Sequence, residues 1–160
     1  MKIFVYSKKE LKNQYYINKK WFCDPNKYFI SISGMMDDCK YPCEFLSHNS
    51  KRVLHLLFDD VTEIESDSSN IILFDIEHAN KIFDFSKSIP ENATLYINCS
   101  AGISRSGAVG CVLNEYLNSD NKEDYLSFYD INSQIQPNPY VKKILSDVVF
   151  GQKNYYEIFK

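Results

Sequence analysis

Residues 96–107, YINCSAGISRSG, combine a cysteine, an arginine and several small residues in an order that suits chemistry on a bound anion. The apolar run 93–97 predicts a short buried strand, and a helical pattern begins near Ile103. Between these elements lies a tight turn that starts with Cys99 and ends with Arg105. The backbone N–H groups of such a turn converge on one anion in front of a helix N-terminus, where the helix dipole also favours negative charge.

We predict that this turn is a phosphate cradle with a nucleophile at its base. Arg105 carries a planar guanidinium whose N–H groups match two phosphate oxygens at once. Cys99 lies in a field that stabilises the thiolate, because a helix N-terminus and a nearby guanidinium both favour negative charge. The predicted phosphate contacts come from the turn itself, and the full set is Ser100, Ala101, Gly102, Ile103, Ser104 and Arg105.

Strand and helix patterns alternate along the chain and place this turn in an α/β domain. Predicted strands cover residues 2–6, 28–33, 52–58 and 93–97. Predicted helices cover residues 8–16, 75–89 and 103–117, the last continuing over 121–128, and a final helix starts at 137–139. Ser7 and Glu10 form a capping-box pattern at the start of the first helix. This order predicts a short, mostly parallel central sheet flanked by helices, with the cradle at the carboxyl end of a central strand.

Three further segments are less regular. Residues 37–48 are expected to hold a helix interrupted by Pro42, residues 63–70 form an acidic surface loop, and residues 155–159 form an apolar tail. No repeat or linker divides the chain, so residues 1–160 are expected to form one domain. A monomer is the default expectation.

Composition narrows the class of partner and the compartment. A net charge of −3 without a long basic block gives nucleic acid and anionic membrane no electrostatic support as partners. The longest apolar runs are far below the ~20 residues that span a bilayer, and the N-terminus lacks a secretory pattern. Five irregularly spaced cysteines indicate reduced thiols and a cytoplasmic protein.

One small group of residues suggests a metal site. Cys39, Cys43 and His48 lie close together in the sequence, but structural zinc sites usually take a second pair of ligands, which is missing here. His55 lies in an apolar strand pattern and is expected in the core. We therefore expect no metal and no cofactor.

The pattern Cys99-x5-Arg105-Ser106 resembles the active-site loop of the cysteine-dependent protein tyrosine and dual-specificity phosphatases. The resemblance implies the phosphatase fold and extends over roughly residues 30–145. Within that range, four stretches resemble small bacterial and phage phosphatase-like proteins: Phe58-Asp-Asp-Val61, Ala79-x2-Ile82-x2-Phe85, Gly102-Ile-Ser-Arg-Ser-Gly107 and Pro137-Asn138-x2-Val141.

The resemblance implies hydrolysis of a phosphate monoester through a phosphocysteine. Cys99 attacks phosphorus, while Arg105 and the N–H groups of the turn stabilise the negative charge on the phosphoryl oxygens in the transition state. Ser106 resembles the family hydroxyl that hydrogen-bonds the sulfur and makes it a better leaving group. A serine here also suits a helix cap, and the two roles are compatible.

The leaving oxygen needs a proton from a carboxyl group. Asp59 and Asp60 end a strand parallel to the active-site strand, so both lie at the edge of the sheet that carries the cradle. In related phosphatases of the Phe-Asp-Asp or Phe-Glu-Asp type the second acid is the donor, which selects Asp60. Asp59 is the first alternative. Asp67, which lies 32 residues before Cys99 as in ordinary dual-specificity enzymes, is the second.

Asn98 is a departure from the family, which usually has histidine before the nucleophile. That histidine supports the cradle and helps to hold the thiolate, whereas an amide donates hydrogen bonds without bringing positive charge. The leading interpretation is an active protein phosphatase that acts on phosphotyrosine alone or on phosphotyrosine and phosphoserine or phosphothreonine. Two alternatives stay open: a weak or inactive phospho-binding pseudophosphatase, and a phosphatase of a nucleotide, an RNA 5′-phosphate or an inositol phosphate.

Overall fold

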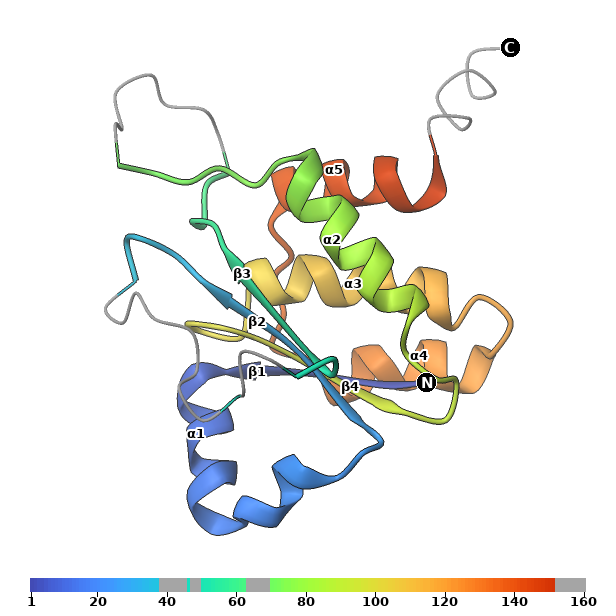
Figure 1. Cartoon of the computed structure of the whole chain (residues 1–160). Helices are drawn as coiled ribbons and strands as arrows, with labels where there is room; N and C mark the ends of the chain where they lie inside the picture. The colour runs from blue at the N-terminus through green and yellow to red at the C-terminus, as the bar shows by residue number, and fades with distance from the viewer. Residues whose placement is uncertain (38–45, 47–49, 63–69, 152–160) are drawn as a thin grey trace.

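Parallel strands form a central sheet in the order β1–β4–β2–β3 (Figure 1). The computed structural model describes residues 1–37, 46, 50–62 and 70–151. Within them the strands are β1 Lys2–Ser7, β2 Lys27–Ser33, β3 Val53–Leu57 and β4 Thr94–Cys99. All three pairings among these strands are parallel. The predicted α/β class and parallel sheet are confirmed.

β4 lies inside the sheet, with β1 on one side and β2 on the other. Ser7 at the end of β1 lies opposite Cys99, and Ser31 of β2 lies opposite Asn98. Because parallel strands end at the same edge of a sheet, the segments that follow β1 and β2 lie beside the turn that follows β4.

Successive side chains of each strand point to opposite faces of the sheet, so the protein has two apolar clusters. Figure 1 shows α2 (Ile76–Lys87), α3 (Arg105–Leu117) and α5 (Pro139–Phe150) over one face. This face buries the larger cluster, to which the strands contribute Ile3, Val5, Ile30, Ile32, Leu56, Leu95, Ile97 and Cys99. The other face is covered by α1 (Lys8–Ile17) and the short 3₁₀ helix η1 (Lys19–Cys23), and its cluster contains Leu11, Phe22, Phe29, Leu46 and Tyr96.

Helix ends follow the predicted capping signals. At α1, Ser7 Oγ accepts a bond from Glu10 N (3.1 Å) and Ser7 N donates to a Glu10 carboxylate oxygen (2.6 Å), which confirms the capping box. Asp75 caps α2. Asn138 caps α5, whose first residue is Pro139. These caps satisfy backbone N–H groups that have no partner inside the helix.

The helix predicted over residues 103–117 is α3, which begins at Arg105 and ends at Leu117. The predicted continuation over residues 121–128 is a separate helix, α4 (Lys122–Ile131). Two side chains hold the chain at the break: Asn118 ends α3 and donates its side-chain amide to Met1 O (2.9 Å), and Asn121 caps α4 through Asp124 N (3.0 Å).

Several predictions fall on other parts of the chain. The interrupted helix of residues 37–48, the acidic loop and the apolar tail lie largely or wholly outside the described residues. Within the described ranges, none of the helices is both long and apolar enough to cross a bilayer.

Candidate active site

The turn between β4 and α3 is held from outside through its carbonyl groups. Gly102 has a φ of 69°, and a Cβ atom there would collide with the backbone of Tyr6 and Ser7, so only glycine fits. Four carbonyl oxygens of the turn accept bonds from surrounding segments: Ser100 from Lys8 N (3.2 Å), Gly102 from Gln134 Nε2 (3.4 Å), Ile103 from Gln136 N (3.1 Å) and Ser104 from Asn138 N (3.1 Å). The predicted cradle therefore has a fixed shape, set by β1, α1 and the segment before α5.

Cys99 and Ser106 lie at the base of this turn. The Cys99 side chain is the last of β4, and its residue is 2% exposed. Its sulfur lies 3.0 Å from the hydroxyl oxygen of Ser106, in the first turn of α3. Sequence reasoning placed these two residues together, and the structure does so as well.

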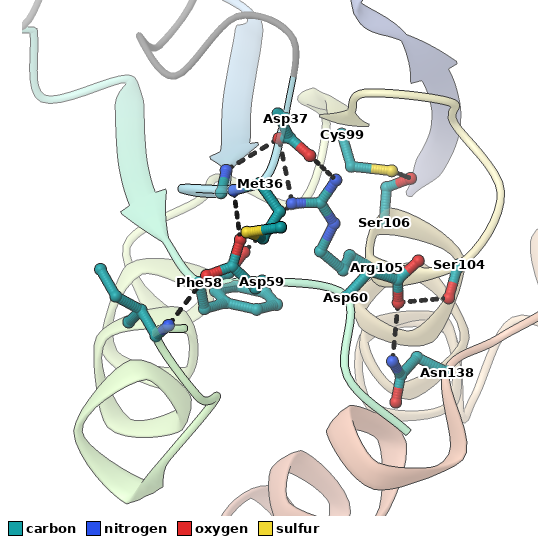
Figure 2. Close-up of polar contacts among 12 residues, drawn as sticks. Met36, Asp37, Phe58, Asp59, Asp60, Cys99, Ser104, Arg105, Ser106 and Asn138 are labelled. Carbon is teal, nitrogen blue, oxygen red and sulfur yellow. Dashed lines mark hydrogen bonds and ion pairs between the residues drawn. The ribbon is translucent and has the colours of Figure 1, made fainter. Parts of the chain in front are cut away.

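Arg105 is buried, and its guanidinium donates to both oxygens of one carboxylate and to one backbone carbonyl. Nη1 and Nη2 donate to the two oxygens of Asp37 at 3.1 and 2.8 Å, and Nη1 also donates to Phe58 O at 3.1 Å (Figure 2). Burial by itself lowers the pKa of Arg105, but the hydrogen bonds and charge of Asp37, together with the nearby Cys99 and Asp60, raise it above its ordinary value. Nε is buried and has no hydrogen-bond partner among the described residues. One N–H donor of the guanidinium is thus held in the interior without an acceptor.

Asp37 is a site residue that sequence reasoning missed. It follows β2 and accepts a bond from Gly34 N (2.8 Å), which closes a small turn at the carboxyl end of that strand. Gly34 is required there, because a Cβ atom would lie 2.6 Å from Asp59 Oδ1 and 2.8 Å from Arg105 Nη1. The sequence shows only that Asp37 is an acidic residue shortly after a predicted strand, and not that this strand lies beside β4.

The two neighbouring acids at the end of β3 have different surroundings. Asp59 is 3% exposed, and its oxygens accept backbone bonds from Met36 N (2.9 Å) and Ile72 N (2.8 Å). Asp60 is exposed, and its Oδ1 accepts bonds from Ser104 Oγ and from Asn138 Nδ2, both at 2.7 Å (Figure 2). Asp59 therefore anchors two chain segments, whereas Asp60 lies against the cradle with its side chain open to solvent.

The remaining candidates are either buried or outside the described residues. Asn98 is 3% exposed and lies between Tyr6 of β1 and Ser31 of β2 in the register. Asp67 lies outside the described residues, as do Cys39, Cys43 and His48. Among the residues that are described, no three His, Cys, Asp or Glu side chains gather as metal ligands.

The fold resembles that of solved phosphatases, although no family model and no curated protein matches the sequence. The crystal structure of PTPMT1 in complex with PI(5)P superposes with a TM-score of 0.53 at 18% identity, over 91% of this chain and 88% of that one. The crystal structure of PTPMT1 alone gives 0.51 at 16% identity, over 98% and 95% of the two chains. The predicted protein tyrosine phosphatase-like fold is thereby confirmed.

Proposed function

We propose that this protein is a cysteine-dependent phosphatase that hydrolyses phosphate monoesters on proteins through a phosphocysteine. The observation that carries the proposal is the meeting of three groups at one turn. The Cys99 sulfur, the Ser106 hydroxyl and the Arg105 guanidinium all lie where β4 passes into α3. The phosphatase-like fold supports the same conclusion at a general level.

Phosphate binding follows from the donors that the turn and Arg105 leave available. A guanidinium has five N–H donors. Asp37 and Phe58 O hold the edge formed by Nη1 and Nη2, so the adjacent edge, formed by Nε and Nη2, is left for two phosphate oxygens. The carbonyl groups of the turn are engaged from outside, which favours inward-facing N–H groups as the other donors.

The reaction then proceeds in two displacements. The Cys99 thiolate attacks phosphorus, and the oxygen of the substrate leaves with a proton from an acid. Water hydrolyses the phosphocysteine, and the Ser106 hydroxyl, 3.0 Å from the sulfur, stabilises the thiolate as it leaves.

Asp60 is the proposed acid. Its side chain is exposed and bonded to Ser104 of the cradle, so it borders the place that a bound phosphate would take. Asp59 is less suited, because both of its oxygens are engaged by backbone N–H groups. Asp67 keeps its place as the second alternative.

A second substrate class has an observation in its favour. PTPMT1 was solved in complex with PI(5)P, a phosphoinositide. In this chain α1 begins beside the cradle, where Lys8 N donates to Ser100 O, and the exposed Lys9 and Lys12 follow. The fold thus brings the start of α1, which opens with Lys8 and Lys9, beside Ser100 of the cradle although the two are remote in the sequence. A basic helix start suits an inositol phosphate headgroup as well as an acidic phosphopeptide.

The test compares hydrolysis of an aryl phosphate by the wild type and by Cys99→Ser. We expect Cys99→Ser to lose turnover and to keep affinity for vanadate, because Arg105 and the turn bind the anion without sulfur. Retention of more than about a tenth of the wild-type rate would exclude covalent catalysis. A panel of phosphopeptides and a short-chain phosphoinositide then separates the two substrate classes. Binding of phosphopeptides without turnover by the wild type would identify the pseudophosphatase instead.

A further inference from the structure

We propose that Asn138 positions the general acid Asp60 and fixes which of its two oxygens carries the proton. The inference rests on the proposed function, since it concerns the acid of that reaction. It assigns a role to a residue that is remote from the acid in the sequence and lies before α5. Asn138 acts through Asp60 and is therefore a positioning residue.

Asn138 is 1% exposed and bonds to both parts of the site. Its Nδ2 donates to Asp60 Oδ1 at 2.7 Å and to Val61 O at 3.1 Å. Its backbone N–H donates to Ser104 O at 3.1 Å. One buried residue thus links the segment that carries the acid to the turn that forms the cradle.

The orientation of the Asn138 side-chain amide is fixed because its oxygen also caps α5. Its Oδ1 accepts bonds from Tyr140 N (3.0 Å) and Val141 N (3.1 Å), the capping bonds at the start of α5. Backbone N–H groups are donors only, so the atom that faces them must be the amide oxygen. The NH₂ group consequently faces Asp60 and Val61, and it is held there by a helix whose Val141 and Leu145 are buried in the core.

Two donors on one oxygen decide where the proton of Asp60 lies. Ser104 Oγ and Asn138 Nδ2 both donate to Oδ1, which is therefore the acceptor oxygen of the carboxyl group. The proton of the neutral acid lies on Oδ2, the oxygen not engaged by these two donors. Asn138 and Ser104 thus select the orientation in which Asp60 can donate.

In the transfer step, the proton passes from Oδ2 of Asp60 to the leaving oxygen. The thiolate of Cys99 forms the S–P bond while the bond from phosphorus to the leaving oxygen breaks, and its electron pair stays on that oxygen. The O–H bond at Oδ2 breaks, and the proton passes to the leaving oxygen. The negative charge left on Asp60 is shared with Oδ1, where the Asn138 and Ser104 donors stabilise it.

Asn138→Asp tests the proposal because it removes the donor and keeps the cap. An aspartate has nearly the same shape and still accepts the N–H groups of Tyr140 and Val141. It places a carboxylate where the NH₂ group faced Asp60 and Val61 O. The matched control is Asn121→Asp, since Asn121 caps α4 through Asp124 N and donates its Nδ2 to the carboxylate of Asp124.

We expect Asn138→Asp to lower kcat/KM for phosphotyrosine, a poor leaving group, by about 10- to 100-fold, within the range of general-acid effects. For an aryl phosphate with an activated leaving group, whose departure needs no acid, we expect a change below about threefold. In the Asp60→Asn background, Asn138→Asp should cause no further loss with phosphotyrosine. Asn121→Asp should leave kcat/KM unchanged for both substrates.

Other results would overturn either the role of Asn138 or the proposed phosphatase function. Equal losses on the two substrates would reduce Asn138 to a structural residue and overturn the proposal. Full additivity with Asp60→Asn would show that Asn138 does not act through Asp60, which also overturns it. Wild-type turnover that survives in Cys99→Ser, or no wild-type turnover at all, would overturn the proposed function and with it the inference. The role of Asn138 alone would be wrong if turnover depended on Cys99 and Asp60→Asn slowed the poor leaving group selectively, while Asn138→Asp did not.

Discussion

Asp37 and Arg105 form two parallel hydrogen bonds, of 2.8 and 3.1 Å, between the turn after β2 and the first residue of α3. The side chain of Arg105 is 4% exposed and that of Asp37 is 14% exposed, so water screens the pair little. The contact holds the edge of the guanidinium formed by Nη1 and Nη2, and Nε has no hydrogen-bond partner among the described residues. In the proposed function, Asp37 therefore sets the orientation in which Arg105 would meet a phosphate.

Asp37→Asn should therefore reduce both activity and stability. The amide keeps the shape but offers the guanidinium one acceptor instead of two, and it brings an N–H₂ group against N–H donors. We expect kcat/KM to fall about 10- to 100-fold, as for a small displacement of a catalytic group. The free energy of unfolding should fall by about 1–3 kcal/mol. Steady-state kinetics and urea unfolding measure the two effects.

The control for Asp37→Asn removes a carboxylate from an exposed ion pair. Asp84 and Lys87 pair in α2 with side chains that are largely exposed, so Asp84→Asn should change stability by less than about 1 kcal/mol and leave kcat/KM unchanged. An Asp37→Asn protein with wild-type kcat/KM would show that the orientation of Arg105 does not depend on this carboxylate.

Arg105→Lys tests the planar fork itself. An ammonium is a point charge and cannot engage Asp37 and two phosphate oxygens together. We expect turnover to fall by at least about 100-fold, the scale seen when one transition-state donor is lost, and vanadate affinity to fall as well. Arg52→Lys is the matched control, because Arg52 binds the carbonyl oxygens of Asp24 and Lys27 away from the cradle. Normal rate and affinity in Arg105→Lys would rule out the proposed cradle geometry.

Asp59 and Asp60 should respond differently to the same substitution. Asp60→Asn is expected to slow phosphotyrosine hydrolysis by about 10²–10⁴-fold and to affect an activated aryl phosphate far less, because a general acid matters most for a poor leaving group. Asp59→Asn should instead lower the free energy of unfolding by about 1–2 kcal/mol, since its two oxygens hold Met36 N and Ile72 N.

Asp67→Asn belongs in the same kinetic series. If Asp67→Asn showed the leaving-group-dependent loss and Asp60→Asn did not, the acid would lie on the acidic loop. The measurement is kcat/KM for both substrates across the three variants, with thermal unfolding to separate stability from chemistry.

Sequence reasoning was most accurate where the signal is local. The turn from Cys99 to Arg105 and the capping box at Ser7 each depend on residues at most six positions apart, and the structure has both features. Asp37 bonds to a residue 68 positions away, and Asn138 bonds to Asp60 across 78 positions. Such pairs arise from strand order and helix packing, which a single sequence does not encode in its local periodicity. The break at Asn118 escaped prediction for the same reason, because its partner is Met1.

Asn98→His addresses the residue that departs from the related phosphatases. Asn98 is buried and directly precedes the nucleophile in β4, and the alternation of the strand points its side chain to the face opposite that of Cys99. A histidine there would add a positive charge near the sulfur when protonated and would stabilise the thiolate. The active ionic form of the enzyme would then persist to lower pH, so we expect the acidic limb of the kcat/KM profile to move downward and activity near pH 6 to rise.

The decisive measurement for Asn98→His is the rate of Cys99 alkylation by iodoacetamide as a function of pH, in both proteins, compared with the two rate profiles. Because only the thiolate reacts, the alkylation rate follows its population directly. Thermal unfolding serves as the control, since an imidazole ring is larger than an amide and the site between β1 and β2 is packed. Alkylation of the wild type at pH 5 with an unchanged profile in a stable Asn98→His protein would show that Arg105 and the backbone amides hold the thiolate without a neighbouring cation. Activity that appears only in Asn98→His would instead assign the natural protein to phosphate binding.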